Sequence, residues 1–225
     1  MSEKRYRCVI FDLDGTLLDT LDDLTDSVNA ALLKYGFSVR TKEEVRHFVG
    51  NGIAKLIERA VPEGTGKEET KKVYEYFCDY YREHCQDKTR PYEGIEPLLS
   101  DLKAKGYQLA IVSNKADFAV KELNDHFFKK WVSVAIGEKE GVLRKPAPDT
   151  VFTAMKELDM SKDDCIYVGD SDVDIQTAEN AGISCISVTW GFRDVDFLKR
   201  NGAKIFARTP DEISKRIVGK CLDVC

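Results

Sequence analysis

Short runs of consecutive apolar residues recur along the chain and predict the strands of a buried sheet. Strands of a parallel sheet that helices cover on both faces are nearly continuous apolar runs, because neither face meets water. Six segments fit this description and are expected to be strands, the last as a short edge strand: 7–11, 107–112, 131–136, 165–168, 184–188 and 203–206.

Segments with helical spacing of apolar residues alternate with these runs from residue 92 onward. Helices are expected over 95–102, over 151–158, from Asp172 to Ala181 and from Pro210 onward. Gly182 stands directly after the third of them, at a position where helix ends favour glycine. This alternation predicts an α/β fold with a doubly wound, Rossmann-like parallel sheet.

One long region breaks the alternation. Residues 12–106 contain no convincing strand, although connections inside an α/β core are normally far shorter. Apolar stripes predict helices within 21–35, 53–60 and 73–84, and a capping box at Thr41 predicts a fourth. Four amphipathic helices can bury a core of their own, so we expect a helical module inserted after the first strand. The expected limits are 19–91 for the module, 1–18 and 92–225 for the core, and 17–20 and 87–92 for the two hinges.

The composition narrows the class of protein. The 225 residues include 34 basic and 39 acidic side chains, with a formal net charge of −5, and 43% are hydrophobic. This balance is typical of an ordinary globular protein and argues against extended disorder, a nucleic-acid partner or an anionic membrane partner. No apolar run reaches the ~18 residues of a membrane span, and the run Cys8–Phe11 is too short for a signal peptide. We therefore expect a cytoplasmic protein, either a monomer or a homodimer.

The cysteines predict neither a zinc site nor a disulfide framework. Their number is odd, no C-x-x-C is present, and with three histidines they show no zinc spacing. The chain carries seven: Cys8, Cys78, Cys85, Cys165, Cys185, Cys221 and Cys225. They are expected to be reduced thiols.

Two carboxylates follow the first expected strand. Asp12 and Asp14 stand two residues apart, and a strand period of two places both on one side. Gly15 permits an unusual turn after them, and Thr16 adds a hydroxyl. Two acids in one pocket repel each other unless one is protonated or a cation is present. The pair therefore indicates a metal site, a nucleophile beside a general acid, or both.

Three further polar clusters are expected to converge with this pair. Ser113, Asn114 and Lys115 follow the second strand, Lys145 precedes a helix, and Asp170 and Asp174 follow the fourth strand. Ligands of an open parallel sheet bind outside the carboxyl ends of its strands. The combined site is too acidic to bind phosphate unaided. Mg²⁺, which proteins hold with carboxylates and substrate phosphates, would resolve the imbalance.

These four clusters resemble, in order and spacing, the motifs of the haloacid dehalogenase superfamily of phosphohydrolases. The motifs are Asp12-x-Asp14-Gly15-Thr16, Ser113, Lys145 and Gly169-Asp170-x-x-x-Asp174. The resemblance covers essentially the whole chain. The family also carries a helical cap inserted just after its first motif, so the resemblance implies that residues 19–91 are a substrate-specificity cap.

The resemblance implies a mechanism for the first motif. Asp12 would be the nucleophile that takes the phosphoryl group as an aspartyl phosphate. Asp14 would be the general acid that protonates the leaving oxygen and then the base that activates water. Dehalogenases of the superfamily lack this second acid, so the leaving group here is expected to be an oxygen that needs a proton.

The resemblance also assigns the surrounding residues. The phosphoryl oxygens would be held by Ser113 and Asn114 with Thr16 nearby, and Lys145 would offset negative charge. The Mg²⁺ ligands would be Asp12, the backbone carbonyl of Asp14, and Asp170, with Asp174 as a further ligand or a partner of the ligands.

A glycine-rich turn in the expected cap is the candidate for substrate contact. Gly50, Asn51 and Gly52 lie between two helices, where backbone can approach a ligand closely. This turn, and Trp190-Gly191 in the core, resemble the phosphoglycolate phosphatase branch of the superfamily. A basic cap residue would suit the carboxylate of phosphoglycolate, with Arg46, Lys55 and Arg59 as candidates.

The resemblance leaves alternatives open. A pyrophosphatase or a β-phosphoglucomutase would share all four motifs, and a phosphonoacetaldehyde hydrolase would need a Schiff-base lysine, for which Lys55 is the candidate. A non-catalytic module that binds a phosphate ligand is a fourth possibility. The favoured interpretation is a Mg²⁺-dependent phosphatase of a small phosphorylated metabolite, similar to phosphoglycolate phosphatase.

Overall fold

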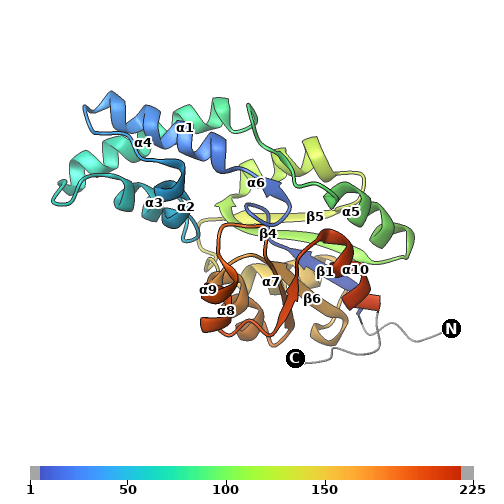
Figure 1. Cartoon of the computed structure of the whole chain (residues 1–225). Helices are drawn as coiled ribbons and strands as arrows, with labels where there is room; N and C mark the ends of the chain where they lie inside the picture. Colours follow the sequence, from blue (N-terminus) through green and yellow to red (C-terminus); the bar gives the residue numbers. More distant parts are fainter. Residues whose placement is uncertain (1–5, 219–225) are drawn as a thin grey trace. The chain divides into compact units, whose positions relative to one another are not determined.

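The computed structural model describes residues 6–218 and divides the chain into two compact units (Figure 1). The core unit comprises Met1–Leu17 and Pro91–Cys225, and the helical unit comprises Leu18–Arg90. Cys221 and Cys225 lie outside the described residues, as do the first five residues of the expected core.

A six-stranded parallel sheet forms the centre of the core unit. Its order is β5-β4-β1-β6-β7-β8, which is the order of a doubly wound sheet, so the predicted fold class is confirmed. The strands are β1 (Cys8–Phe11), β4 (Gln108–Ala116), β5 (Val134–Glu138), β6 (Cys165–Gly169), β7 (Ser184–Val188) and β8 (Ile205–Ala207).

Strand β1 lies in the middle of this sheet and is buried on both faces. Cys8 and Ile10 pack into an apolar cluster with side chains of α7 (Asp149–Glu157) and α8 (Asp172–Ala181). Val9 and Phe11 alternate with them toward the other face and are equally inaccessible. This double burial explains why the strand is a continuous apolar run.

The remaining helices of the core lie between the strands or, in the case of the last one, follow the final strand. They are α5 (Ile95–Ala104), α6 (Asp117–Leu123), α9 (Val195–Arg200) and α10 (Pro210–Val218), with the π-helix η1 (Asn124–Phe128) and the 3₁₀-helix η2 (Lys162–Asp164). Helix α8 ends as predicted at Gly182, which has a left-handed φ of 71°. The short helices α6 and α9 were not expected from the sequence.

Four helices make up the helical unit: α1 (Leu21–Lys34), α2 (Lys42–Phe48), α3 (Ile53–Ala60) and α4 (Lys67–His84). The predicted capping box is present, since Thr41 Oγ1 accepts from Glu44 N and Thr41 N donates to Glu44 Oε2. The unit has an apolar interior, in which Phe77 and Tyr81 of α4 stack with ring centroids 5.3 Å apart.

Two short strands lie where the chain leaves the core unit and returns to it. Strands β2 (Leu18–Asp19) and β3 (Arg90–Pro91) pair with each other as a two-stranded sheet. Beside them the Tyr92 N–H donates to the Leu17 carbonyl at 3.1 Å. The first and last residues of the insertion are therefore neighbours.

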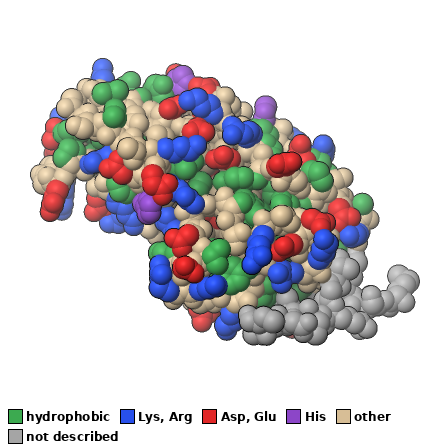
Figure 2. All heavy atoms as spheres, in the orientation of Figure 1, with side chains coloured by type: hydrophobic (Ala, Val, Ile, Leu, Met, Phe, Trp, Pro, Cys, Tyr) green, Lys and Arg blue, Asp and Glu red, His purple; other side chains and the backbone are tan. Residues whose placement is uncertain are grey.

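The surface carries both signs of charge. Figure 2 shows basic and acidic side chains interspersed over the visible face, with no large area of one sign. Within residues 6–218, no helix combines the length and the apolar character needed to cross a membrane. The five described cysteines, Cys8, Cys78, Cys85, Cys165 and Cys185, are free thiols.

Two strand boundaries differ from the prediction by three residues or more. The third strand was expected to start at Trp131, but β5 begins at Val134 because Trp131 and Val132 lie in a buried turn. The second strand was expected to end at Val112, but β4 continues to Ala116. The second difference shapes the candidate site.

Candidate active site

The sheet order creates a crevice between β1 and β6. From β1 the chain builds β4 and β5 on one side and then crosses to β6 on the other, which is the switch point where doubly wound folds bind ligands. Asp12 follows β1, and its N–H donates to the carbonyl of Val168 in β6 at 2.9 Å. Asp170 follows β6 directly. The topology thus brings these two predicted site residues together.

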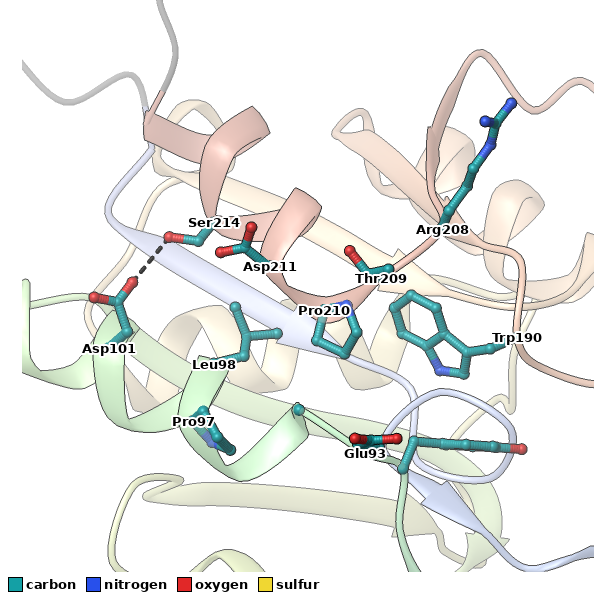
Figure 3. Close-up of a pocket in the computed structure, with 12 residues that line it drawn as sticks. Glu93, Pro97, Leu98, Asp101, Trp190, Arg208, Thr209, Pro210, Asp211 and Ser214 are labelled. Carbon is teal, nitrogen blue, oxygen red and sulfur yellow. Dashed lines mark hydrogen bonds between the residues drawn. The ribbon is translucent and has the colours of Figure 1, made fainter.

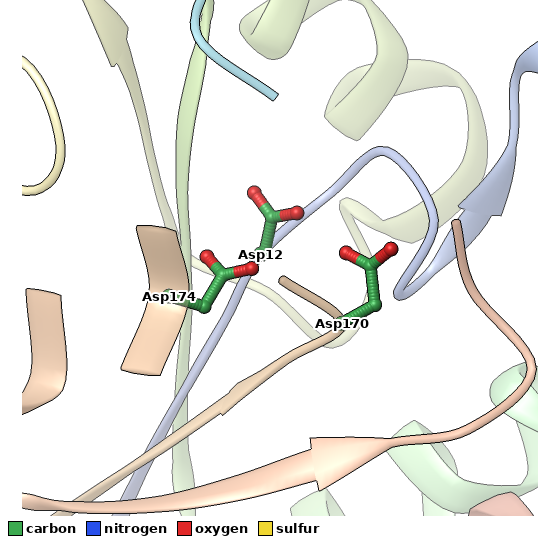
Figure 4. Close-up of side chains that lie close together, drawn as sticks. All are labelled: Asp12, Asp170 and Asp174. Atoms are coloured by element: carbon green, nitrogen blue, oxygen red, sulfur yellow. The ribbon is translucent and has the colours of Figure 1, made fainter. Parts of the chain in front are cut away.

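Three carboxylates form a cluster at this crevice. Asp12, Asp170 and Asp174 each place an oxygen within 4.8 Å of the other two, and all three residues are buried (Figure 4). Figure 4 shows Asp12 and Asp170 at the ends of their strands and Asp174 on helix α8. The side chain of Asp14 is not a member of this group.

Lys145 supplies a positive charge to the cluster. Its Nζ lies 2.7 Å from Asp12 Oδ1 and 2.8 Å from Asp174 Oδ1. It also donates to the Tyr167 hydroxyl at 3.1 Å. Burial alone would lower the pKa of Lys145, but the charges of Asp12 and Asp174 outweigh it and raise that pKa well above its ordinary value. The two neighbouring carboxylates therefore favour the charged form of this lysine.

The two carboxylate oxygens of Asp174 have different partners, one at the start of helix α8 and the other in the site. Its Oδ2 accepts from the N–H and the hydroxyl of Ser171, which completes the capping box at the start of α8. Its Oδ1 accepts from Lys145 Nζ and, at 3.2 Å, from the Tyr167 hydroxyl. Four donors thus fix this carboxylate in one orientation.

Asp170 lies in a pocket that leaves no room for a side chain at two neighbouring positions. A Cβ at Gly15, whose φ is 87°, would lie 2.5 Å from Asp170 Oδ2, and one at Gly191 would lie 2.3 Å from Asp170 Cβ. The carboxylate accepts from the Phe192 N–H at 2.7 Å and from the Thr16 hydroxyl at 3.4 Å. These contacts orient Asp170 toward the crevice.

The charges of the cluster fit a divalent cation. Burial, together with the charge of Asp174, raises the pKa of Asp12 well above its ordinary value and that of Asp170 to about 7. When all three are ionised, the carboxylates and Lys145 carry a net charge of −2, which Arg193 offsets only in part through its charge near Asp170. Oxygen ligands of this kind suit a hard ion such as Mg²⁺.

A bulge at the end of β4 presents the second predicted cluster. Val112 pairs with Ile136 of β5 and Ala116 with Glu138, so β4 advances four residues where β5 advances two. Ser113, Asn114 and Lys115 of β4 therefore stand opposite the single residue Gly137 of β5, so two residues are extra on β4. Their orientation thus depends on the pairing of two strands.

Each bulge residue has a defined contact. Ser113 Oγ accepts a hydrogen bond from the Lys115 N–H at 3.2 Å. This bond does not involve the hydrogen of the Ser113 hydroxyl, which can still donate. Asn114 Nδ2 donates to the carbonyl of Lys145 at 3.0 Å and so holds the loop that carries this lysine. Lys115 Nζ donates to Asp14 Oδ1 at 2.9 Å.

The pairing of Lys115 with Asp14 was missed from the sequence. Both side chains are largely inaccessible, at 4% and 16% exposure. A lysine directly after Ser113-Asn114 at a strand end was the available signal, but the strand was expected to end before it. Thr16 was expected near the phosphoryl oxygens. In the structure its side chain is fully buried, and its hydroxyl donates to Asp170.

The remaining predicted residues lie in the helical unit. Gly50 and Gly52 have φ values of 124° and 81°, so the turn between α2 and α3 uses backbone that favours glycine. Arg59 holds this turn, since its guanidinium donates to the Phe48 carbonyl at 2.7 Å and to Asn51 Oδ1 at 2.8 Å. Arg46 lies 3.6 Å from Glu43 in an ion pair.

A separate hollow of about 600 Å³ lies in the core unit beside helices α5 and α10 (Figure 3). Trp190, Leu98 and Pro210 give it apolar walls, and none of the clustered carboxylates lines it. The Trp190 indole N–H donates to the carbonyl of Thr16 at 3.1 Å. One wall of the hollow is thus bonded to the loop that follows Asp14.

Known proteins resemble this chain over most of its length. The family model of haloacid dehalogenase-like hydrolases matches residues 9–188. Phosphoglycolate phosphatase 1 of Pseudomonas aeruginosa is 33% identical over 195 residues, covering 83% of this chain and 70% of that protein. The phosphoglycolate phosphatase of Neisseria meningitidis serogroup A is 32% identical over 205 residues, covering 89% and 87%.

Solved structures agree with these relatives. A crystal structure from Lactobacillus delbrueckii subsp. bulgaricus, provisionally named a phosphoglycolate phosphatase, is 38% identical. Its TM-score is 0.92, with 96% of this chain and 100% of that chain covered. A predicted phosphatase from Clostridium acetobutylicum is 31% identical with a TM-score of 0.84, covering 94% and 98%.

Proposed function

We propose a function from the premise that this chain belongs to the haloacid dehalogenase-like hydrolase family. The proposed reaction is the hydrolysis of a small phosphate monoester, with Mg²⁺ as the cofactor. The observation that carries the proposal is the position of Asp12, which lies at the switch point of the sheet, 2.7 Å from Lys145 and clustered with Asp170 and Asp174. A carboxylate held this way is a suitable nucleophile for a phosphoryl group.

The proposed reaction has two steps. A carboxylate oxygen of Asp12 attacks phosphorus, the bond to the leaving oxygen breaks, and Asp14 gives that oxygen a proton. Asp14, now ionised, then takes a proton from water, which attacks phosphorus and releases Asp12 and inorganic phosphate. Lys145 keeps its charge throughout and offsets the negative charge that gathers beside Asp12.

The Mg²⁺ would be held by Asp12 and Asp170, in addition to the Asp14 backbone carbonyl that the family resemblance implies. Bound there, the ion would neutralise phosphoryl oxygens. Asp174 is better suited to hold Lys145 and α8, because both of its oxygens already accept hydrogen bonds from protein donors. We therefore place Asp174 as a partner of the ligands.

The phosphoryl oxygens would be bound by Ser113 and the Asn114 amide at the β4 bulge. The hydroxyl of Ser113 has a hydrogen available beyond the bond it accepts from Lys115. Thr16 is assigned instead to orienting Asp170, because its side chain is fully buried and donates to that carboxylate.

The proposed substrate class is a small phosphorylated metabolite, with phosphoglycolate as the first candidate because the relatives are phosphoglycolate phosphatases. The test is phosphate release from phosphoglycolate, pyrophosphate, sugar phosphates and p-nitrophenyl phosphate, with and without Mg²⁺. A preference of about 100-fold for one ester would correspond to about 2.7 kcal/mol of transition-state binding and would identify the class. Absence of Mg²⁺-dependent turnover across the panel, with retained phosphate binding, would instead favour a non-catalytic module.

The panel also separates the related enzymes. A preference for pyrophosphate would identify a pyrophosphatase, and interconversion of sugar phosphates would identify a mutase. A Schiff-base mechanism at Lys55 has no structural support, because Lys55 is half exposed and pairs with Glu58 at 2.6 Å. We further propose that the enzyme works in the cytoplasm, as a monomer or a homodimer.

We assign residues 19–91 as the cap and its turn Gly50-Asn51-Gly52, with Arg46, as the determinant of substrate choice. Replacing Arg59 with methionine removes both bonds that hold the turn, so we expect the ranking of substrates in the panel to change by about 10-fold, which is the range of a few altered contacts. Arg82→Met on α4 is the matched control. An unchanged ranking in Arg59→Met would contradict a role for this turn.

Mg²⁺ is expected to stabilise the protein more at pH 8 than at pH 5. Because burial raises the pKa of Asp170 from 3.8 to about 7, the metal-free fold binds a proton there that the unfolded chain has lost. The metal-free protein therefore loses stability as the pH rises through about 7, and the ion replaces that proton. At 100 times its dissociation constant Mg²⁺ contributes about 2.7 kcal/mol, which raises the Tm by about 5–10 °C at pH 8. Equal shifts at both pH values, or a full shift in Asp170→Asn, would contradict the assignment.

A further inference from the structure

Each of the two carboxylates of the first motif forms an ion pair with its own buried lysine. Lys145 Nζ lies 2.7 Å from Asp12 Oδ1, and Lys115 Nζ lies 2.9 Å from Asp14 Oδ1. Each lysine side chain is only 4% exposed. An ammonium group removed from water to this extent is costly unless a charged partner compensates it. The nucleophile and the proton donor of the proposed reaction thus each have a lysine.

We propose that Lys115 is a positioning residue that holds the Asp14 carboxylate in place for proton transfer, an inference that rests on the function proposed above. Lys115 is not one of the residues of the four family motifs, so the family resemblance gives it no role. Its contact is with Asp14, so it acts on the reaction through that carboxylate.

Contacts of its own backbone fix the position of Lys115. Its N–H donates to Ser113 Oγ, and its carbonyl packs against Gly137 of β5, where a Cβ would lie 2.5 Å from the carbonyl oxygen. The Gly137 N–H in turn donates to Asp117 Oδ1 at 3.0 Å. The bulge is therefore held on both sides, and the lysine side chain extends from a rigid base.

The ion pair restricts a carboxylate that would otherwise rotate. Asp14 precedes Gly15, whose φ of 87° turns the backbone sharply, and its side chain retains 16% exposure. The bond from Lys115 engages Oδ1 and leaves Oδ2 for the proton that passes to the leaving oxygen and is later taken back from water. Lys115 keeps its own proton in both steps. Small losses of orientation are expensive in proton transfer, because the reacting atoms must lie at hydrogen-bond distance.

The leaving group distinguishes this role from a structural one. An alkoxide needs a proton as it leaves, whereas p-nitrophenolate leaves without one. Lys115→Met is therefore expected to lower kcat/KM for the best alkyl phosphate of the panel by about 10- to 100-fold. For p-nitrophenyl phosphate we expect less than about a 3-fold loss. The ratio kcat/KM reports only the steps up to departure of the first product, and p-nitrophenolate departs without a proton from Asp14. Lys115→Arg should restore most of the alkyl activity, and Lys121→Met, which removes an exposed lysine paired with Asp117, is the matched control.

A double mutant tests whether Lys115 acts through Asp14 and avoids an unpaired buried charge. Asp14→Asn/Lys115→Met is expected to match Asp14→Asn in kcat/KM for the alkyl ester, and a further loss of 10-fold would overturn the inference. An equal loss on both esters in Lys115→Met, or no loss on either, would also overturn it. Wild-type protein inactive on both esters with Mg²⁺ would refute the proposed function itself.

Discussion

Replacing Asp12 with asparagine is expected to abolish turnover of every phosphate ester, with a loss of at least about 10³-fold in kcat. The amide is a poor nucleophile, and the substitution removes the charge to which Lys145 donates at 2.7 Å. The fold should persist, because the amide has the size of the carboxylate and one buried negative charge of three is removed. Phosphate release and the far-ultraviolet circular dichroism spectrum are the measurements.

The control for this substitution is Asp172→Asn. Asp172 belongs to the first turn of α8, and its side chain is 39% exposed, so the same chemical change is made beside the site but outside the carboxylate cluster. Turnover in Asp12→Asn within 10-fold of the wild type would reject Asp12 as the nucleophile. Trapping of a phosphorylated protein in the wild type but not in Asp12→Asn would support it.

Replacing Lys145 with methionine is expected to cost both activity and stability. The substitution leaves Asp12 and Asp174 facing each other in a buried site without the ammonium that now lies between them. Breaking a buried ion pair by removing one partner typically costs about 3–5 kcal/mol, and we expect a loss of this size in the free energy of unfolding. Urea unfolding in the presence of a chelator measures it without compensation by a bound ion.

Lys121→Met is the corresponding control, because the Lys121 side chain is 56% exposed, so its ion pair with Asp117 is open to water on the lysine side. We expect this variant to change the free energy of unfolding by less than about 1 kcal/mol. If Lys145→Met were as stable and active as Lys121→Met, the buried lysine would be irrelevant to both the cluster and the reaction.

The main features of the fold were predictable because local pattern and burial agree. The strand at 184–188 and the helix Asp172–Ala181 were predicted with the boundaries that the structure shows. In both, most of the apolar positions that define the pattern are buried in the core, and Cys185 is half-buried. The carboxyl ends of β1 and β6 also lie where the alternation of strand and helix requires, which is why Asp12 and Asp170 could be paired in advance.

The details that the sequence did not predict depend on contacts between segments. The bulge after Val112 exists because β4 pairs with β5 on both sides of it and Gly137 allows close approach. No periodicity in 107–116 carries that information, so the contact of Lys115 with Asp14 could not be inferred. Likewise, Thr16 could be placed near the site but not facing Asp170, because that orientation depends on the turn at Gly15.

The bond between Leu17 and Tyr92 has a consequence for protein engineering. The chain leaves the core and returns to it at positions joined by a 3.1 Å hydrogen bond, so the helical unit is an insertion with adjacent ends. A short turn would close the core if the insert were excised, and the added loop entropy would be small. The same junction could accept an unrelated domain, which makes this α/β core a candidate scaffold for modular grafting.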